Sequence, residues 1–394
     1  MSTVEKKILL FIEKHLFVLA LIGISLVAIL IRFSYKDFIS VDMRDFLLPW
    51  YEEIKEQGGF PALRDRVGNY NILYQTLIAF LTYIPVPPVA AYKLLSCLFD
   101  FACAVTGGCM ICRLGKDKWK GLAGYALLLL SPVTGMNSAL WGQCDSVYTF
   151  FLVLAVYMLM KEKYHVSFIC LGFAFAFKLQ AVFILPFFLF YYFYKRRFSI
   201  FHFLWMPAIL FATGIPGLVM GRDWDECLSI YYSQTRWYRY QYMNYPSFWA
   251  VFSGSDNACY DMFSVAAICV TVTILAAIMV ICLVRKMEIS GENIIYLSLL
   301  LTYTCVLFLP AMHERYGYSY EIFAIILAVI NRRGRWKAGA LILISCVTYG
   351  HYLCGTDYNT QLFAAANVIV YACYLRDFFQ AKSSVPNMAS QDKS

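Results

Sequence analysis

Residues 11–31 read FIEKHLFVLALIGISLVAILI, and this apolar run is long enough to cross the hydrocarbon core of a bilayer as one helix. It lacks an Ala-x-Ala-like cleavage site and exceeds the apolar region of a signal peptide, so the sequence predicts a first transmembrane helix here. Comparable apolar stretches recur almost to the end of the chain and leave no polar block that could fold as a soluble domain. The sequence therefore predicts an integral membrane protein.

The composition leads to the same class of protein. Of the 394 residues, 61% are hydrophobic and 15% are charged, whereas a soluble domain carries about 25% charged residues. The net charge of +8 comes from Lys and Arg residues in short loops, which we interpret as orientation signals and not as a nucleic-acid-binding surface. The cysteines are scattered and form no Cys-x-x-Cys pair in a loop, so neither metal nor thiol chemistry is expected.

We predict an all-α polytopic membrane protein with about twelve transmembrane helices, built as a single domain of residues 1–381. Ten of the crossings are expected near residues 11–31, 89–112, 119–136, 145–160, 200–220, 263–284, 292–310, 316–331, 337–353 and 360–376. The polar tail, residues 382–394, is expected to be disordered and cytoplasmic.

Two further apolar segments need a separate interpretation. Residues 70–84 are short and end in a proline-rich turn, and a full crossing would put the basic loop 113–120 on the outside. We therefore expect a re-entrant or interfacial helix after the first outer loop. Residues 166–194 are too long for one crossing and have Lys178 and Gln180 at their middle, so we expect a hairpin of two short helices. With these assignments, both termini and the basic loops face the cytoplasm.

Two carboxylates three residues apart, Asp42 and Asp45, lie in the first outer loop and would share one face of a helix. A carboxylate at the lipid interface is a candidate general base for deprotonating a hydroxyl. The alternatives are that Asp45 caps a short helix beginning at Phe46, and that Asp42 pairs with Arg44.

Two more ionisable residues, Asp145 and Lys178, are expected at membrane depth. Charges are costly there, so both are functional candidates. The alternative is a buried ion pair that holds helices together, formed by these two residues with each other or with other partners. For Asp145 the functional interpretation is favoured, because Trp141-Gly142-Gln143 precedes it at a loop-helix junction.

An outer turn near residues 309–316 combines His313, Glu314 and Arg315 at the end of an apolar helix. Arg315 is suited to bidentate contact with a phosphate, and His313 could donate to the same group. The alternative is a structural network in which Glu314 neutralises Arg315.

The large outer loop, residues 221–260, is rich in arginines and aromatic residues, among them Arg236, Arg239 and Tyr245. Such a composition is typical of a membrane-interface belt. It would also suit a groove in which aromatic rings stack on a sugar and arginines pair with phosphate oxygens.

Four phrases occur in order along the chain: Asp42-x-x-Asp45, Trp141-Gly142-Gln143-Cys144-Asp145 with Asn137 to Leu140 before it, Phe177-Lys178-Leu179-Gln180, and Met312-His313-Glu314-Arg315-Tyr316. Together they resemble the GT-C superfamily of integral membrane glycosyltransferases, particularly bacterial relatives of the PIG-V type GPI mannosyltransferases. The resemblance spans nearly the whole chain. It departs from the family pattern at Leu179, where a proline is expected.

The resemblance implies a polyprenyl-phosphate sugar as donor, used without a nucleotide on the extracytoplasmic face. An outer-loop carboxylate, Asp42, Asp45 or Asp145, would be the catalytic base. The donor phosphate would bind to the cationic or imidazole side chains of His313, Arg315 and Lys178. Further substrate contacts are expected from Trp141, Gln143, Gln180, Glu314, Tyr316, Arg236, Arg239 and Tyr245.

We therefore predict an inverting hexosyltransferase, with mannose favoured, in a bacterial plasma membrane. The acceptor would be a lipid-linked or cell-surface glycan. No cofactor and no dedicated metal site are expected, although acidic outer loops leave a divalent ion possible. The alternatives are a transporter or flippase of a lipid-linked saccharide, or an oligosaccharide polymerase or ligase that uses a lipid diphosphate donor.

Overall fold

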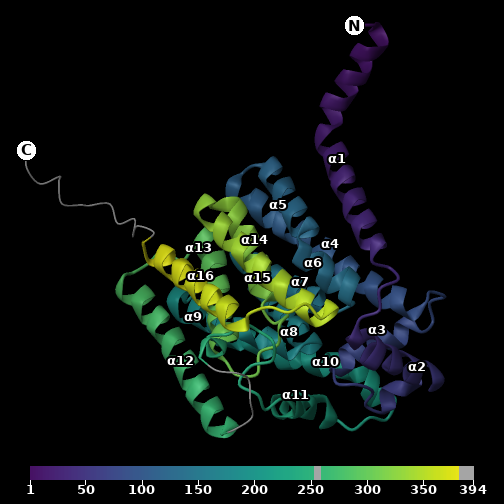
Figure 1. Ribbon diagram of the computed structural model, residues 1–394, viewed down its shortest axis with the longest axis vertical. Helices are drawn as coiled ribbons and strands as arrows, with labels where there is room; N and C mark the ends of the chain where they lie inside the picture. Colours follow the sequence, from purple (N-terminus) through teal and green to yellow (C-terminus); the bar gives the residue numbers. More distant parts are fainter. Residues whose placement is uncertain (253–258, 381–394) are drawn as a thin grey trace, which may run out of the picture.

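The structure is a computed structural model that describes residues 1–252 and 259–380, without the side chains of residues 227, 228 and 236. The described part is almost wholly helical, as predicted, and contains an isolated pair of bridges, from Met243 and Asn244 to His313, instead of a sheet. Figure 1 shows the helices packed into one bundle, from which α1 (Thr3–Ser34) projects. The predicted disordered tail, residues 382–394, lies outside the described residues.

Among the described residues, five helical segments are long and apolar enough to cross a membrane: α1, α4 (Pro88–Gly115), the run Ile200–Val219 that ends in α10 (Trp205–Val219), α12 (Tyr260–Val284) and α16 (Thr360–Gln380). The other helices of the bundle include α5 (Lys118–Leu130), α6 (Pro132–Gly135), α7 (Asp145–Met160), α13 (Glu292–Phe308), α14 (Tyr318–Ile330) and α15 (Arg335–Cys354). The all-helical membrane class is thus confirmed, while the number of about twelve crossings stays a prediction.

The segment predicted to form a helical hairpin does so. Its first helix, α8 (Tyr164–Phe177), stops at Lys178, whose extended backbone (φ −153°, ψ 134°) cannot continue a helix. A short 3₁₀ turn and α9 (Leu185–Lys195) then return the chain. Arg197 Nη1 lies 2.7 Å from Glu162 Oε1, so the two ends of the hairpin meet. Lys178 is therefore at the apex, far from the basic loops.

The short apolar segment after the first outer loop forms α3 (Ile72–Leu81), which is about 15 Å long and spans half of a hydrocarbon core. Just after α3, the Tyr83 hydroxyl donates to the carbonyl oxygen of Gly58, which precedes α3, at 2.8 Å. Near the start of α4, Lys93 donates to the carbonyl oxygen of Tyr35, which follows α1, at 2.6 Å. The chain thus stays at one end of the bundle, in agreement with the predicted re-entrant or interfacial helix.

The loops rich in Lys and Arg gather at the opposite end of the bundle. Arg285, after α12, donates to the carbonyl oxygen of Phe379, near the end of α16, at 3.1 Å. In Figure 1, the first residues of α1 lie opposite the end formed by α2 (Leu48–Glu56), α3 and α11 (Glu226–Trp237). The positive-inside rule predicts that the basic end faces the cytoplasm.

A buried ion pair anchors α1, most of which faces outward. Arg32 Nη2 lies 2.8 Å from Asp100 Oδ2 of α4 and donates to the carbonyl oxygen of Leu129 in α5 at 3.1 Å. Both side chains of the pair are buried, and losing one partner of such a pair costs about 3–5 kcal/mol. The pair therefore fixes the end of α1, and with it the start of the first outer loop.

Candidate active site

The turn between α13 and α14 is held in place by the large outer loop. α13 ends where the backbone of Leu309 becomes extended and Pro310, which has no backbone N–H, follows. The N–H of Met243 donates to the carbonyl oxygen of Met312 at 2.9 Å, next to the isolated bridge at His313. This pairing fixes the backbone that carries the His-Glu-Arg phrase.

The carboxylate of Asp42 is almost buried and accepts hydrogen bonds on both oxygens. Its Oδ2 accepts from Trp141 Nε1 at 3.0 Å and from Gln143 Nε2 at 2.5 Å. Its Oδ1 accepts from the Tyr352 hydroxyl at 2.5 Å. Arg315 Nη1 lies 3.7 Å from Oδ2. Side chains from distant parts of the chain thus fix the orientation of this carboxylate.

Asp45 has a different environment. It lies within a π-helical turn, Met43–Leu47, and its side chain is 45% exposed and 2.8 Å from Arg44 Nε. The hydrogen bond from Arg44 lowers the pKa of Asp45 below its usual value. Arg44 thus pairs with Asp45 and not with Asp42, and Asp45 caps no helix, so neither of the structural alternatives considered for these carboxylates is present. Of the two loop carboxylates, the structure brings Asp42 into the cluster and leaves Asp45 on the surface.

Asp145 and Lys178 form a buried ion pair between the start of α7 and the apex of the hairpin. The second oxygen of Asp145 accepts from Asn137 Nδ2 at 3.0 Å. Lys178 Nζ also lies over the rings of Tyr70 and Tyr148, at 5.8 and 5.7 Å from their centroids. The pairing considered as the structural alternative is thus present.

Arg315 lies among three carboxylates. Its Nη1 is 3.1 Å from Glu314 Oε1 and 3.7 Å from Asp42 Oδ2, and its Nε is 3.7 Å from Asp145 Oδ2. The guanidinium covers the ring of Trp141 at 5.3 Å, and its Nε has no hydrogen-bond partner among the described residues. A guanidinium has five N–H donors, so Arg315 keeps donors for a further anion.

Burial and charge determine the ionisation of the neighbouring groups. Burial, with the charges of Arg315 and Lys178, lowers the pKa of His313 well below its usual value, so its imidazole is neutral and has one N–H to donate. Burial raises the pKa of Glu314, and the adjacent Arg315 opposes this rise. The rings of Tyr238 and Tyr316 lie 4.7 and 5.1 Å from the imidazole and fix its position.

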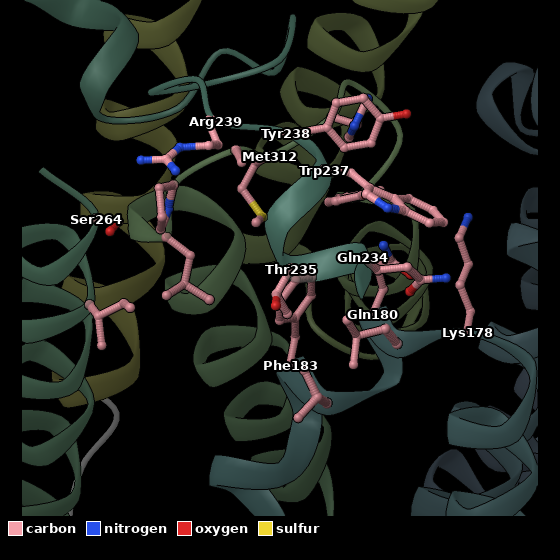
Figure 2. Close-up of a pocket in the computed structure, with 18 of the residues that line it drawn as sticks. Lys178, Gln180, Phe183, Gln234, Thr235, Trp237, Tyr238, Arg239, Ser264 and Met312 are labelled. Atoms are coloured by element: carbon pink, nitrogen blue, oxygen red, sulfur yellow. The ribbon is translucent and has the colours of Figure 1, made fainter. Parts of the chain in front are cut away.

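A cavity of about 870 Å³ opens beside this cluster (Figure 2). Its polar wall contains Lys178, Gln180, His313, Arg315 and Tyr316. Apolar residues of the 3₁₀ turn, of α12 and of the turn before His313 complete it, among them Leu179, Val182, Phe183, Ile268, Leu309 and Met312. Figure 2 shows Lys178 on one side and Arg239 and Ser264 on the other, with Trp237 and Tyr238 of the outer loop between them.

The remaining candidate residues fall into separate groups. Trp141 and Gln143 bind Asp42 and do not appear in the described cavity wall, whereas Arg239 lies in that wall and pairs with Asp261 at 2.6 Å. Tyr245 is buried elsewhere, with its hydroxyl 2.5 Å from that of Tyr320. The expected substrate contact of Tyr245 is thus not supported by its position. The side chain of Arg236 lies outside the described residues.

Sequence reasoning missed Tyr352, which binds Asp42, and Tyr70, whose hydroxyl donates to Gln143 Oε1 at 3.2 Å. Tyr352 lies in the last turn of α15, shortly before the polar residues 356–360, and that location is the signal that could have marked it. In the described part of the chain, no group of three or more His, Cys, Asp or Glu side chains is placed to hold a metal ion.

The sequence profile of glycosyltransferase family 87 matches residues 69–310, more than half of the chain. The matched region contains Asp145, Lys178 and most of the cavity wall, whereas Asp42 and Arg315 lie outside it. No curated protein matches the chain.

Proposed function

Because the chain belongs to glycosyltransferase family 87, a family of membrane glycosyltransferases of the GT-C type, we propose that it transfers a hexose, with mannose favoured, from a polyprenyl-phosphate sugar. The acceptor would be a hydroxyl group of a lipid-linked or cell-surface glycan. The closer resemblance to the PIG-V type stays a prediction. We further propose that residues 1–381 act as one domain in a bacterial plasma membrane, with the site on the extracytoplasmic face.

The position of Arg315 carries this proposal. Its guanidinium lies in the wall of the cavity, and the carboxylates of Asp42 and Asp145 lie behind it at 3.7 Å. Displacement at an anomeric carbon needs a cation for the phosphate that leaves and a base for the hydroxyl that attacks. Arg315 supplies the cation for the leaving phosphate, and Asp42 is the best-placed base for the attacking hydroxyl.

The composition of the cavity suits a lipid phosphate. Lys178, His313 and Arg315 offer donors for a phosphate within one wall. The apolar residues Val182, Phe183 and Ile268 offer a surface for a polyprenyl chain. Beyond Ile268, α12 carries outward-facing apolar side chains such as Val272, which is 57% exposed. A lipid-anchored donor could therefore enter from the bilayer with its phosphate directed to Arg315.

In the proposed reaction the acceptor oxygen attacks the anomeric carbon from the face opposite the phosphate. The new C–O bond forms while the C–O bond to the phosphate breaks, and the phosphate leaves with the bonding electrons. The acceptor proton passes to Asp42. One displacement inverts the anomeric centre. The pair of Lys178 with Asp145 would hold the ammonium toward the leaving phosphate.

The transporter alternative needs polar residues along a path that opens to both sides of the membrane. Here Asp42, Asp145, Lys178 and Arg315 meet at one end of the bundle. Between the two ends, residues 294–308 of α13 are all buried in the described core. This packing favours an enzyme that works at one face.

The test uses purified protein in lipid nanodiscs with undecaprenyl-phosphate mannose, glucose or galactose, each radiolabelled in the sugar, and a panel of glycan acceptors. Transfer of label with release of undecaprenyl phosphate is expected, and GDP-mannose should be inactive. If GDP-mannose is the better donor, or if label appears only on the opposite side of sealed vesicles without covalent transfer, the proposal is wrong.

A further inference from the structure

The two oxygens of the Asp42 carboxylate differ in how fully they are used. Oδ2 accepts from Trp141 at 3.0 Å and from Gln143 at 2.5 Å, with Arg315 a further 3.7 Å contact. Among the described residues, Oδ1 has one donor, the Tyr352 hydroxyl at 2.5 Å. Each carboxylate oxygen has about two lone-pair sites, so Oδ2 is fully occupied and Oδ1 keeps one site open.

From this asymmetry we infer that Oδ1 of Asp42 receives the acceptor proton, and that Tyr352 is the positioning residue that presents this oxygen to the acceptor. This inference rests on the proposed function, in which Asp42 is the base. It also places the acceptor on the side of Tyr352, because the described wall of the donor cavity contains neither Tyr352 nor Asp42.

The surroundings of Tyr352 make its hydroxyl a fixed donor. Its ring stacks on Trp141, with a centroid distance of 4.9 Å and an interplanar angle of 26°. Three residues after Tyr352, Gly355 caps the end of α15 with φ 68°, a conformation that disfavours residues with a Cβ atom. Tyr352 itself is partly exposed, whereas Trp141 is fully buried. We therefore expect an acceptor hydroxyl to approach Oδ1 beside the partly exposed tyrosine, and not Oδ2, which bonds the buried tryptophan.

The proton balance is simple in this arrangement. The acceptor O–H bond breaks as its oxygen bonds to the anomeric carbon, and the proton moves to the open lone pair of Oδ1. The phenol proton of Tyr352 stays on its oxygen throughout. Its role is to hold the ionised carboxylate in one rotamer before the transfer.

Tyr349 provides a matched control for Tyr352. It lies one turn earlier on α15, and its ring contacts the same tryptophan, Trp141, at 5.2 Å and 83°. Its hydroxyl interacts with Asn137 and makes no hydrogen bond to Asp42. Tyr349→Phe and Tyr352→Phe each remove one hydroxyl from the same helix, but only the second removes a donor to Asp42.

The experiment measures kcat and KM for the polyprenyl-phosphate hexose that supports turnover. The stoichiometry of undecaprenyl phosphate binding is measured in parallel, because it counts the correctly folded sites in each preparation. Tyr352→Phe is expected to lower kcat per binding site about ten- to hundredfold, because a hydrogen bond to a charged group is lost, and to leave the donor KM within about twofold. Tyr349→Phe is expected to change neither constant by more than about twofold.

Two results would overturn the inference while leaving the proposed function intact: equal kcat values for the two variants, or a Tyr352→Phe variant that changes the donor KM alone. If Tyr352→Phe binds undecaprenyl phosphate at fewer sites yet has normal turnover per site, the residue is structural and the inference is also wrong. Failure of every donor with the wild-type protein would instead contradict the proposed function.

Discussion

Lys178→Met and Asp145→Asn together test whether the buried ion pair is structural, functional or both. Both side chains of the pair are buried, with exposed fractions of 4% for Lys178 and 0% for Asp145. Breaking a buried pair costs about 3–5 kcal/mol when one charge is left without compensation. The two single variants should not be equal, because the two residues have different remaining partners.

Without Lys178, Asp145 still accepts from Asn137 at 3.0 Å and lies 3.7 Å from Arg315. Without the charge of Asp145, Lys178 has no other carboxylate within 4 Å among the described residues. We therefore expect Asp145→Asn to cost about 3–5 kcal/mol and Lys178→Met clearly less, about 1–3 kcal/mol. The double variant should recover much of the loss, because no isolated charge remains.

Thermal unfolding in detergent ranks the stabilities, and sugar transfer per undecaprenyl-phosphate-binding site reports function. Lys178→Met and the double variant should both lose transfer, because Lys178 lies in the cavity wall. The matched control is Asp377→Asn, which breaks the largely buried pair with Lys337 at the basic end of the bundle and should lower stability but not transfer per site. Normal transfer by the stable double variant would refute a role for Lys178 in phosphate binding. A Lys178→Met variant less stable than Asp145→Asn would refute the charge argument.

Three further outcomes are expected. Asp42→Asn should lower kcat about 10²- to 10⁴-fold and Asp45→Asn less than about twofold, because of these two carboxylates only Asp42 lies beside Trp141 and Arg315. Equal losses of kcat in the two variants would point to a different base. The pKa of His313 is lowered in the folded protein, so below pH 6.5 the unfolded chain binds more protons than the folded one. On acidification, the stability of the wild type should therefore fall by about 1.4 kcal/mol per pH unit more than that of His313→Gln, as measured by thermal shift. Parallel stability curves for the two proteins would contradict this. Treatment with EDTA should leave transfer unchanged, because Arg315 and Lys178 already serve as counter-charges to Asp42 and Asp145. Loss of activity that Mg²⁺ restores would instead show a metal site.

Features that depend on local chemistry could be predicted from the sequence. The break at Lys178 followed from a charged residue in the middle of an apolar segment, and the structure confirms a hairpin with its apex there. The link between Asp145 and Lys178 was predicted as one of two alternatives, because two opposite charges at membrane depth are costly unless paired. The shortness of α3 likewise followed from its bounding polar and proline residues.

Features that depend on contacts between distant segments could not be predicted. Asp42 and Asp45 are equivalent in sequence, and only the donors Trp141 and Tyr352, about 100 and 310 residues away, distinguish them. Tyr245 was grouped with loop aromatics, but its partner Tyr320 belongs to α14, which no local pattern reveals. A loop tyrosine and a buried one look alike until the packing of the helices is known.

The location of Arg315 between the base and the cavity gives the site a way to keep its charge balanced. In the proposed reaction the donor phosphate gains one negative charge when it leaves, and Asp42 loses one when it takes the acceptor proton. The total charge around Arg315 is then unchanged, but one negative charge has moved from Asp42 to the phosphate in the cavity. The guanidinium is 3.7 Å from Asp42 Oδ2 and also lies in the cavity wall, so it can interact with the negative charge before and after the transfer without leaving its position over Trp141.

Arg315→Lys would keep the positive charge but offer a single ammonium to both Asp42 and the phosphate, so we expect a larger loss in kcat than in donor affinity. Equal losses in both, measured by transfer and by undecaprenyl phosphate binding, would mean that Arg315 binds the donor and does not couple the base to the leaving group.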